Sequence, residues 1–108
     1  MPALPAPVEE AFAATNDGDL ARFVAAFADD GVIDDWGREF RGREEIADWS
    51  RRESIGVQQT FAVTDVREGD GEVVVIADVG GGGFNGPSTF TFRLVPDGAA
   101  IERMTITA

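Results

Sequence analysis

The chain has 108 residues, an apolar content of 44% and a formal net charge of −11, which suits one acidic domain spanning residues 1–108. It contains no Cys, His, Lys or Tyr, and this excludes a catalytic thiol, a disulfide framework, an imidazole base and a Schiff-base lysine. The negative surface repels phosphate backbones and anionic lipids, so we expect no nucleic-acid or membrane partner.

The first third of the chain has the hydrophobic spacing of two helices. Apolar residues recur at i, i+3, i+4 and i+7 from Pro7 onward, and Asn16-Asp17-Gly18 is expected to end this first helix. Asp19 can cap a second helix, whose apolar face is predicted to extend as far as Phe27. The polar run Asp29-Asp30-Gly31 should end it.

A short strand and a third helix follow. The strand fits Val32–Trp36, and a polar turn is predicted through Gly37 and Arg38. A third helix begins after Gly42, with acidic residues in its first turn, basic residues in its last and Trp49 on its buried face.

The second half of the chain alternates apolar and polar residues with the period of β-strands. The predicted strands are Val57–Thr64, Val73–Val79, Ser88–Val95 and Ala100–Thr107, and a hairpin turn is expected at Glu68–Gly71. Five strands and three helices predict an α+β fold in which a curved antiparallel sheet packs against helices from the N-terminal half. The concave face of such a sheet would enclose a pocket.

One glycine-rich segment resembles a nucleotide-binding motif. Residues Gly81–Gly86 match G-x-G-x-x-G, but a strand-like segment, Pro87–Phe92, follows where the dinucleotide site requires a helix. We therefore expect the glycines to form a bulge or a flexible loop, placed as a lip over the pocket mouth.

Nothing in the sequence predicts export or membrane insertion. The start of the chain, Met1–Pro7, lacks a basic region and contains three prolines, so a signal peptide is not expected. The longest apolar runs, Phe23–Ala28 and Val73–Ala77, are too short to span a bilayer. A cytoplasmic location is predicted.

Carboxylates are the only remaining acids or bases for proton transfer. Asp34 and Asp35 adjoin on an apolar strand, so alternation should send them to opposite faces, and Asp78 interrupts an apolar run. Burial in an apolar pocket raises the pKa of a carboxyl group and suits it to proton transfer near neutrality. The alternatives are solvation at the strand end or pairing with Arg38 or Arg41 for Asp35, and exposure at a sheet edge for Asp78.

Three segments, Asn16–Leu20, Phe27–Asp35 and Phe40–Ile46, together with the order of the elements, resemble the nuclear transport factor 2-like superfamily. The likeness is to its SnoaL-like and ketosteroid isomerase-like members. This resemblance implies a cone-shaped α+β barrel that encloses a pocket and commonly forms a homodimer through the outer face of its sheet.

The resemblance also assigns roles by position. Asp35 falls where the steroid isomerases hold their catalytic aspartate base. Ala11 stands in place of their oxyanion-hole tyrosine, and Ser88 falls near their protonated aspartic acid. Both oxyanion donors are therefore missing, and the indole N–H of Trp36 or Trp49 or the hydroxyl of Ser88 would have to substitute.

A second branch, the limonene-epoxide-hydrolase-like proteins, uses an arginine and aspartate pair on a central strand. Asp78 falls near that aspartate, but Ile76 occupies the position of the arginine, so the pair is broken. Epoxide opening is the weaker candidate.

The expected site has Asp35 and Asp78 as its catalytic candidates and no cofactor or metal. The candidate substrate-binding residues are Trp36, Phe40, Trp49, Phe61, Ser88 and Phe90. The hypothesis is a small-molecule pocket protein that transfers protons on an apolar carbonyl compound, as an isomerase or cyclase would. The alternatives are a non-catalytic ligand-binding or dimerisation module, and an interaction subunit whose pocket is filled by side chains.

Overall fold

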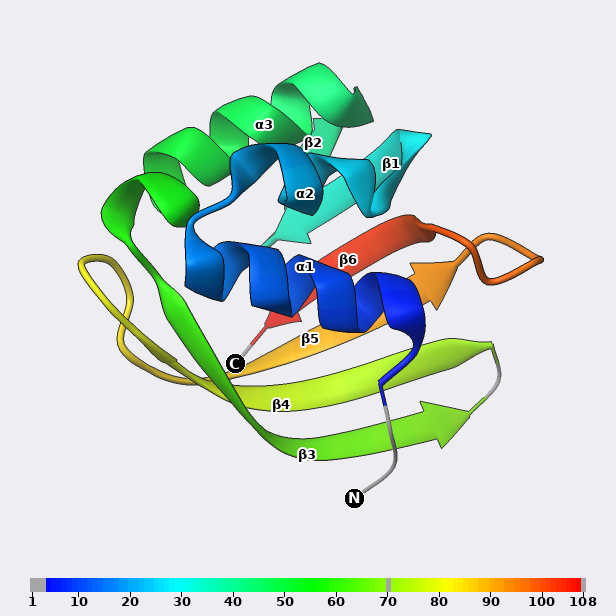
Figure 1. Ribbon diagram of the computed structural model, residues 1–108. Coiled ribbons are helices and arrows are strands. Elements are labelled where there is room, and N and C mark those ends of the chain that lie inside the picture. Colours follow the sequence, from blue (N-terminus) through cyan, green and yellow to red (C-terminus); the bar gives the residue numbers. More distant parts are fainter. Residues whose placement is uncertain (1–3, 70, 108) are drawn as a thin grey trace.

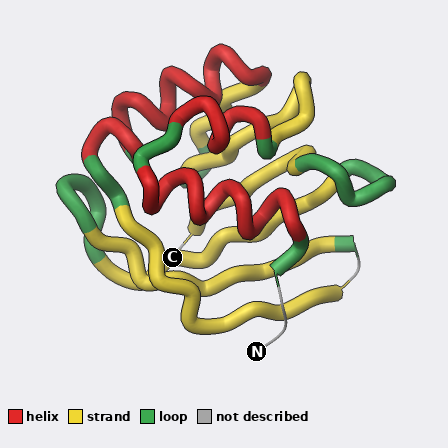
Figure 2. Tube along the Cα trace, viewed as in Figure 1, coloured by secondary structure: helices red, strands yellow, loops and turns green. Residues whose placement is uncertain are grey.

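The computed structural model describes residues 4–69 and 71–107, in which three α-helices cover one face of a strongly curved sheet (Figure 1; Figure 2). The helices are α1 (Ala6–Asp17), α2 (Leu20–Ala25) and α3 (Gly42–Glu53), and a 3-10 turn, η1 (Ile55–Val57), follows the last of them. The strands are β1 (Phe27–Asp35), β2 (Arg38–Arg41), β3 (Thr60–Gly69), β4 (Glu72–Gly80), β5 (Gly86–Leu94) and β6 (Ile101–Thr107). The predicted α+β class is confirmed.

The six strands form one sheet in the order β2-β1-β6-β5-β4-β3. All neighbouring pairs are antiparallel except β1 and β6, which run parallel. The C-terminal strand therefore lies in the middle of the sheet and joins the meander β3-β4-β5 to the hairpin β1-β2. The consecutive strands β3, β4, β5 and β6 pair antiparallel, as predicted. The bounds predicted for β3 are wrong, because it begins at Thr60 rather than Val57 and extends to Gly69; Asp70 in the predicted turn lies outside the described residues.

Strand β2 is a correction to the sequence prediction, which placed a polar turn in this region. The turn is confined to Trp36 and Gly37, and Arg38–Arg41 pairs with the end of β1 as an edge strand. Three of its four residues are exposed and only Phe40 is half-buried. Such a short, charged edge strand has no alternating apolar pattern, so periodicity could not detect it.

The second helix is also shorter than predicted. Asp19 caps it as expected, with Oδ1 accepting a hydrogen bond from the backbone N–H of Arg22 (3.2 Å), but the helix ends at Ala25. Phe27 already belongs to β1, where it pairs with Ile101 and packs against Phe23. Burial against the sheet overrides the local helical spacing here.

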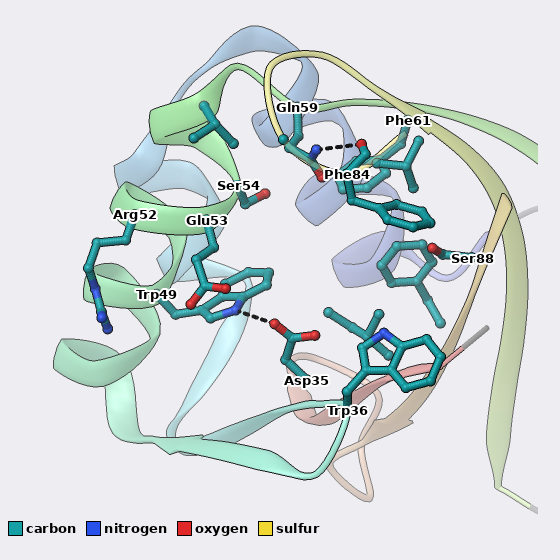
Figure 3. A pocket seen from close by; sticks show the side chains of 15 residues that line it. Asp35, Trp36, Trp49, Arg52, Glu53, Ser54, Gln59, Phe61, Phe84 and Ser88 are labelled. Atoms are coloured by element: carbon teal, nitrogen blue, oxygen red, sulfur yellow. Dashed lines mark hydrogen bonds between the residues drawn. The ribbon is translucent and has the colours of Figure 1, made fainter. Parts of the chain in front are cut away.

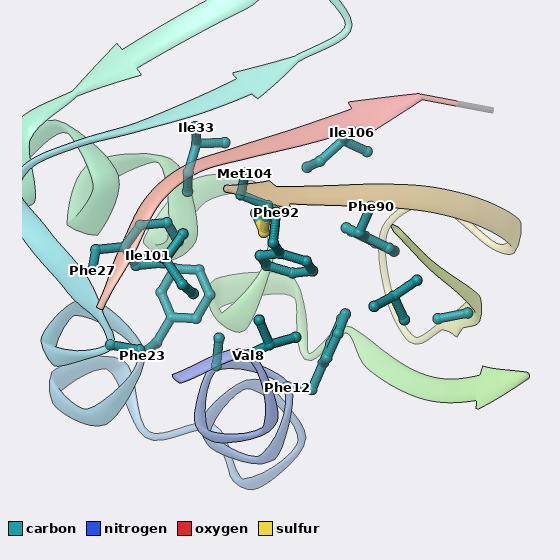
Figure 4. Close-up of a cluster of buried hydrophobic side chains, with 14 of the residues drawn as sticks. Val8, Phe12, Phe23, Phe27, Ile33, Phe90, Phe92, Ile101, Met104 and Ile106 are labelled. Carbon is teal, nitrogen blue, oxygen red and sulfur yellow. The ribbon is translucent and has the colours of Figure 1, made fainter. Parts of the chain in front are cut away.

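The core lies between the helices and the concave face of the sheet (Figure 4). Phe12 of α1 lies at its centre and meets three strand phenylalanines edge-on. These are Phe61, Phe90 and Phe92, at ring-centroid distances of 5.3, 5.4 and 5.6 Å. Most of the phenylalanines are therefore packing residues.

No helix within residues 4–69 and 71–107 has the length and apolar character needed to cross a membrane.

Candidate functional site

An open pocket of about 400 Å³ lies beside the aromatic core, between the end of α3 and the concave face of the sheet (Figure 3). Its residues come from the end of β1, the last turn of α3, η1, the loop before β5, and strands β3 to β6. The lining consists of Asp35, Trp36, Trp49, Arg52, Glu53, Ser54, Val57, Gln59, Phe61, Val79, Gly83, Phe84, Ser88, Phe90 and Ile106. The volume falls within the range of pockets that hold small molecules.

Strand alternation places Asp35 in this pocket. Its neighbour Asp34 points to the opposite face, where Oδ2 accepts a hydrogen bond from Arg103 (2.7 Å). Asp34 Oδ1 also accepts from the backbone N–H of Gly37 (2.8 Å), which holds the turn into β2. Two adjacent aspartates thus have different roles because successive side chains on a strand alternate in direction.

The two carboxylate oxygens of Asp35 have different surroundings. Oδ2 accepts hydrogen bonds from the indole N–H of Trp49 (3.1 Å) and from Arg38 (2.6 Å). Among the described residues, Oδ1 has no hydrogen-bond partner, and in Figure 3 it points into the pocket. The Asp35 side chain retains only 14% of its exposed area, and just over half of the residues that line the pocket are apolar.

Arg38 links Asp35 to Glu53 across the pocket edge. Its guanidinium donates to both oxygens of Glu53, at 2.6 and 3.1 Å, and its carbon lies 5.6 Å from the ring centroid of Phe40. The hydrogen bonds to Glu53, and then the one to Asp35, raise the pKa of Arg38 above its ordinary value. The arginine therefore stays charged and holds the two carboxylates in place.

Two exposed aromatic side chains flank the pocket mouth. Trp36 is 64% exposed and Phe84 is 57% exposed, and both line the pocket. Trp36 has a φ of +55° and is followed by Gly37 at +90°, which is the geometry of a two-residue turn that usually takes Asn-Gly. A bulky residue in this left-handed conformation is strained, and such strain is concentrated at functional positions.

The glycine-rich segment forms the opposite lip, but its glycines are required for close packing. The backbone N–H of Gly82 donates to the carbonyl of Val57 (2.8 Å), and a Cβ on Gly81 would lie 2.2 Å from the carbonyl oxygen of Gln58. Gln59 Nε2 donates to the carbonyl of Phe84 (2.8 Å) and fixes the lip further. Strand β5 follows directly, so no helix N-terminus is available for a phosphate.

Six of the eight predicted site residues line the pocket. They are Asp35, Trp36, Trp49, Phe61, Ser88 and Phe90. Phe40 does not line it, because it lies on β2 with its ring 6.4 Å from that of Trp49. Asp78 does not line it either: it is exposed, whereas its strand neighbours Ala77 and Val79 are buried on the concave side.

Sequence reasoning missed several lining residues at the end of α3 and between α3 and β3. Neither Glu53 nor Ser54 was among the predicted site residues. Gln59 did carry a signal, because it is a polar residue at an inward position of the predicted strand Val57–Thr64. In the structure it lies just before β3 and is 6% exposed. Among the described residues, no three acidic side chains converge as a metal site would need.

The sequence comparison decides the family. Residues 8–103 match the SnoaL-like domain family. The chain belongs to this family. No curated protein matches the sequence significantly. The match to the SnoaL-like family confirms the nuclear transport factor 2-like superfamily that the sequence segments suggested.

Solved structures agree with this fold. A candidate polyketide cyclase from Sinorhizobium meliloti shares 23% identity, with a TM-score of 0.82 over 96% of this chain and 95% of that one. A Mycobacterium tuberculosis protein in complex with estradiol-17β-hemisuccinate shares 20% identity, with a TM-score of 0.79 over 95% and 91%. A Catenulispora acidiphila protein of ketosteroid isomerase-like fold, in complex with trimethylamine, shares 22% identity, with a TM-score of 0.82 over 98% and 87%.

Proposed function

We propose that this SnoaL-like protein binds a small, largely apolar carbonyl compound and transfers a proton on it, with Asp35 as the general base. The observation that carries the proposal is that the two oxygens of the Asp35 carboxylate have different surroundings. Oδ2 is held by Trp49 and Arg38, and Oδ1 is left to face an apolar pocket. A fixed, unpartnered carboxylate oxygen is the geometry that a general base requires.

The reaction follows from that geometry. Oδ1 would accept a proton from the carbon next to the carbonyl group, and the electrons of the C–H bond would form a C=C bond. Negative charge then develops on the carbonyl oxygen, and return of the proton to the same or another carbon completes the cycle. Of the oxyanion donors expected from the sequence, the Trp49 N–H is already committed to Asp35 and Trp36 flanks the pocket mouth, which leaves the Ser88 hydroxyl.

Two of the structural neighbours support the choice of ligand class, because one is described as a candidate polyketide cyclase and one holds a steroid derivative. Asp78 is left out of the proposal, since it does not line the pocket. Phe40 enters it only as support for Trp49 and Arg38.

The test is hydrogen exchange at carbon in D₂O. NMR would follow loss of the α-proton signals of 2-decalone, a bicyclic ketone, in the presence of wild-type protein, Asp35→Asn or Asp34→Asn. Removal of a general base costs roughly 10²- to 10⁴-fold, so Asp35→Asn should lose the catalysed exchange. Asp34→Asn, an identical change on the opposite face, should keep it. Exchange by Asp35→Asn at the wild-type rate would show that Asp35 is not the base.

A non-catalytic ligand-binding module remains the second candidate, and two observations favour it. Asp35 forms an ion pair with Arg38 at 2.6 Å, and Ala11, in the position of the family's tyrosine, offers no hydrogen-bond donor. Saturable binding of the ketone by the wild-type protein without α-proton exchange would select this module over the enzyme.

We also propose the homodimer that the sequence resemblance implies. The face of the sheet away from the helices carries half-buried β-branched side chains, including Val74, Ile76 and Thr91. An apolar, β-branched surface of this kind suits a second copy of the chain. Sedimentation equilibrium would distinguish dimer from monomer. The cytoplasmic location and the single-domain organisation stay predictions from the sequence.

A further inference from the structure

Ser54, which directly follows α3, is a buried residue whose hydroxyl contributes no hydrogen bond to the fold among the described residues. The residue is 2% exposed, and among the described residues Oγ has no hydrogen-bond partner. Its backbone is fully engaged: the N–H donates to Ser50, and the carbonyl accepts from Val57 and Gln59, all at 3.1 Å. These bonds fix Ser54 in place and leave only its hydroxyl unpaired.

Ser54 lies on the wall between the pocket and the aromatic core. Ser54 lines the open pocket and also a small hollow of about 10 Å³ behind it, formed largely by aromatic rings. In Figure 3 its oxygen points away from α3 toward the space that the pocket residues enclose. The other hydroxyl at the hollow, that of Thr15, is satisfied because it donates to the carbonyl of Ala11 (2.9 Å).

An unpaired buried hydroxyl destabilises a folded protein, because it loses its hydrogen bonds to water and gains none in return. Alanine at position 54 would preserve the packing without this cost. The hydroxyl of Ser50, one helical turn earlier, is likewise unpaired, but Ser50 lines neither the pocket nor the hollow. Ser50 therefore offers a matched control that separates the general effect of a buried hydroxyl from an effect on the ligand.

We propose that the Ser54 hydroxyl donates a hydrogen bond to an oxygen atom of the bound ligand and thereby selects oxygenated ligands over hydrocarbons of the same shape. This inference rests on the proposed function, since it concerns the same pocket. The ligand class is a compact apolar ring compound with a ketone or hydroxyl oxygen at the end that enters first. Trp36 and Phe84 would then contact the end that stays near the mouth.

The experiment compares two ligands with three proteins. The ligands are 2-decalone and decalin, which share a carbon skeleton and differ by one carbonyl oxygen. The proteins are the wild type, Ser54→Ala and Ser50→Ala. Binding is read from intrinsic fluorescence, because the chain has two tryptophans and no tyrosine, and both Trp36 and Trp49 line the pocket. Thermal unfolding of each unliganded protein checks the fold.

One lost hydrogen bond corresponds to a weakening of ketone binding by about fivefold to tenfold in Ser54→Ala. Decalin binding should be unchanged in that variant, and Ser50→Ala should bind both ligands as the wild type does. Unliganded Ser54→Ala should unfold at or above the wild-type temperature, because an unpaired buried hydroxyl has been removed.

Two results would overturn the inference while the proposed function stands. In one, Ser54→Ala binds the ketone as tightly as the wild type does, and in the other it loses both ligands equally. Failure of the wild-type protein to bind either compound would overturn the proposed function, and the role of Ser54 with it.

Discussion

The space between the helices and the sheet has two ends that differ in what fills them. At the inner end the rings of Phe12, Phe90 and Phe92 leave a hollow of only about 10 Å³. At the open end the same sheet encloses about 400 Å³, with the charged pair of Asp35 and Arg38 at its edge. Both ends use inward-facing residues of the same strands. Side-chain size and charge, rather than backbone architecture, therefore separate the part that stabilises the fold from the part that can bind a ligand.

The largest expected effect on stability comes from replacing a phenylalanine with alanine at each end. Phe92→Ala removes a fully buried ring and should lower the free energy of unfolding by about 3 to 5 kcal/mol. Phe84→Ala removes a 57% exposed ring at the pocket mouth and should change stability by no more than about 0.5 kcal/mol. Urea unfolding measures both. Equal losses of stability would contradict the division into a stabilising end and a binding end.

A smaller effect is expected from Arg38→Gln, which removes the bridge between Asp35 and Glu53. The guanidinium is exposed, so the urea midpoint should barely move. The carboxylates would face each other without their shared cation, so the surroundings of the Trp49 indole, and with them its fluorescence, should change. Arg41→Gln is the control, because Arg41 is exposed and its guanidinium lies 3.9 Å from the carboxylate of Glu39. A fluorescence change of equal size in both variants would argue against a specific bridge.

The smallest expected effect is a gain in stability at the pocket mouth. Trp36→Asn should raise the free energy of unfolding by up to about 1 kcal/mol, because asparagine tolerates the left-handed turn conformation better. The same variant should weaken binding of 2-decalone, since one aromatic flank of the mouth is lost. Gln58 has the same φ of +55° and does not line the pocket, so Gln58→Asn should give a similar gain with binding unchanged. A loss of stability in Trp36→Asn would remove the argument for strain.

The sequence predicted most of the elements because their signals are local. Hydrophobic spacing located the three helices, and alternation located β4, β5 and β6 to within two residues. The edge strand β2 was missed because three of its four residues are charged and exposed. Phe27 was misassigned because its pairing partner, Ile101, is remote in sequence.

The candidate site was predictable where it depends on strand alternation and not where it depends on distant contacts. Alternation was enough to send Asp34 and Asp35 to opposite faces. The bridge from Arg38 to Glu53 and the burial of Ser54 depend on how α3 packs against the sheet, which no local pattern encodes. Asp78 was a wrong candidate for the pocket. Its acidic side chain interrupts an apolar run in the sequence, but it lies on the outer face of β4, while its neighbours Ala77 and Val79 are buried on the inner face.

The central claim is that the space beside Asp35 is a ligand pocket, and the two indole N–H groups test it most directly. The protein has two tryptophans, both of which line the pocket, and the Trp49 N–H donates to Asp35. In a ¹H–¹⁵N NMR titration with 2-decalone, both indole signals should shift saturably with one dissociation constant. Indole signals that stay in place throughout the titration would contradict the account.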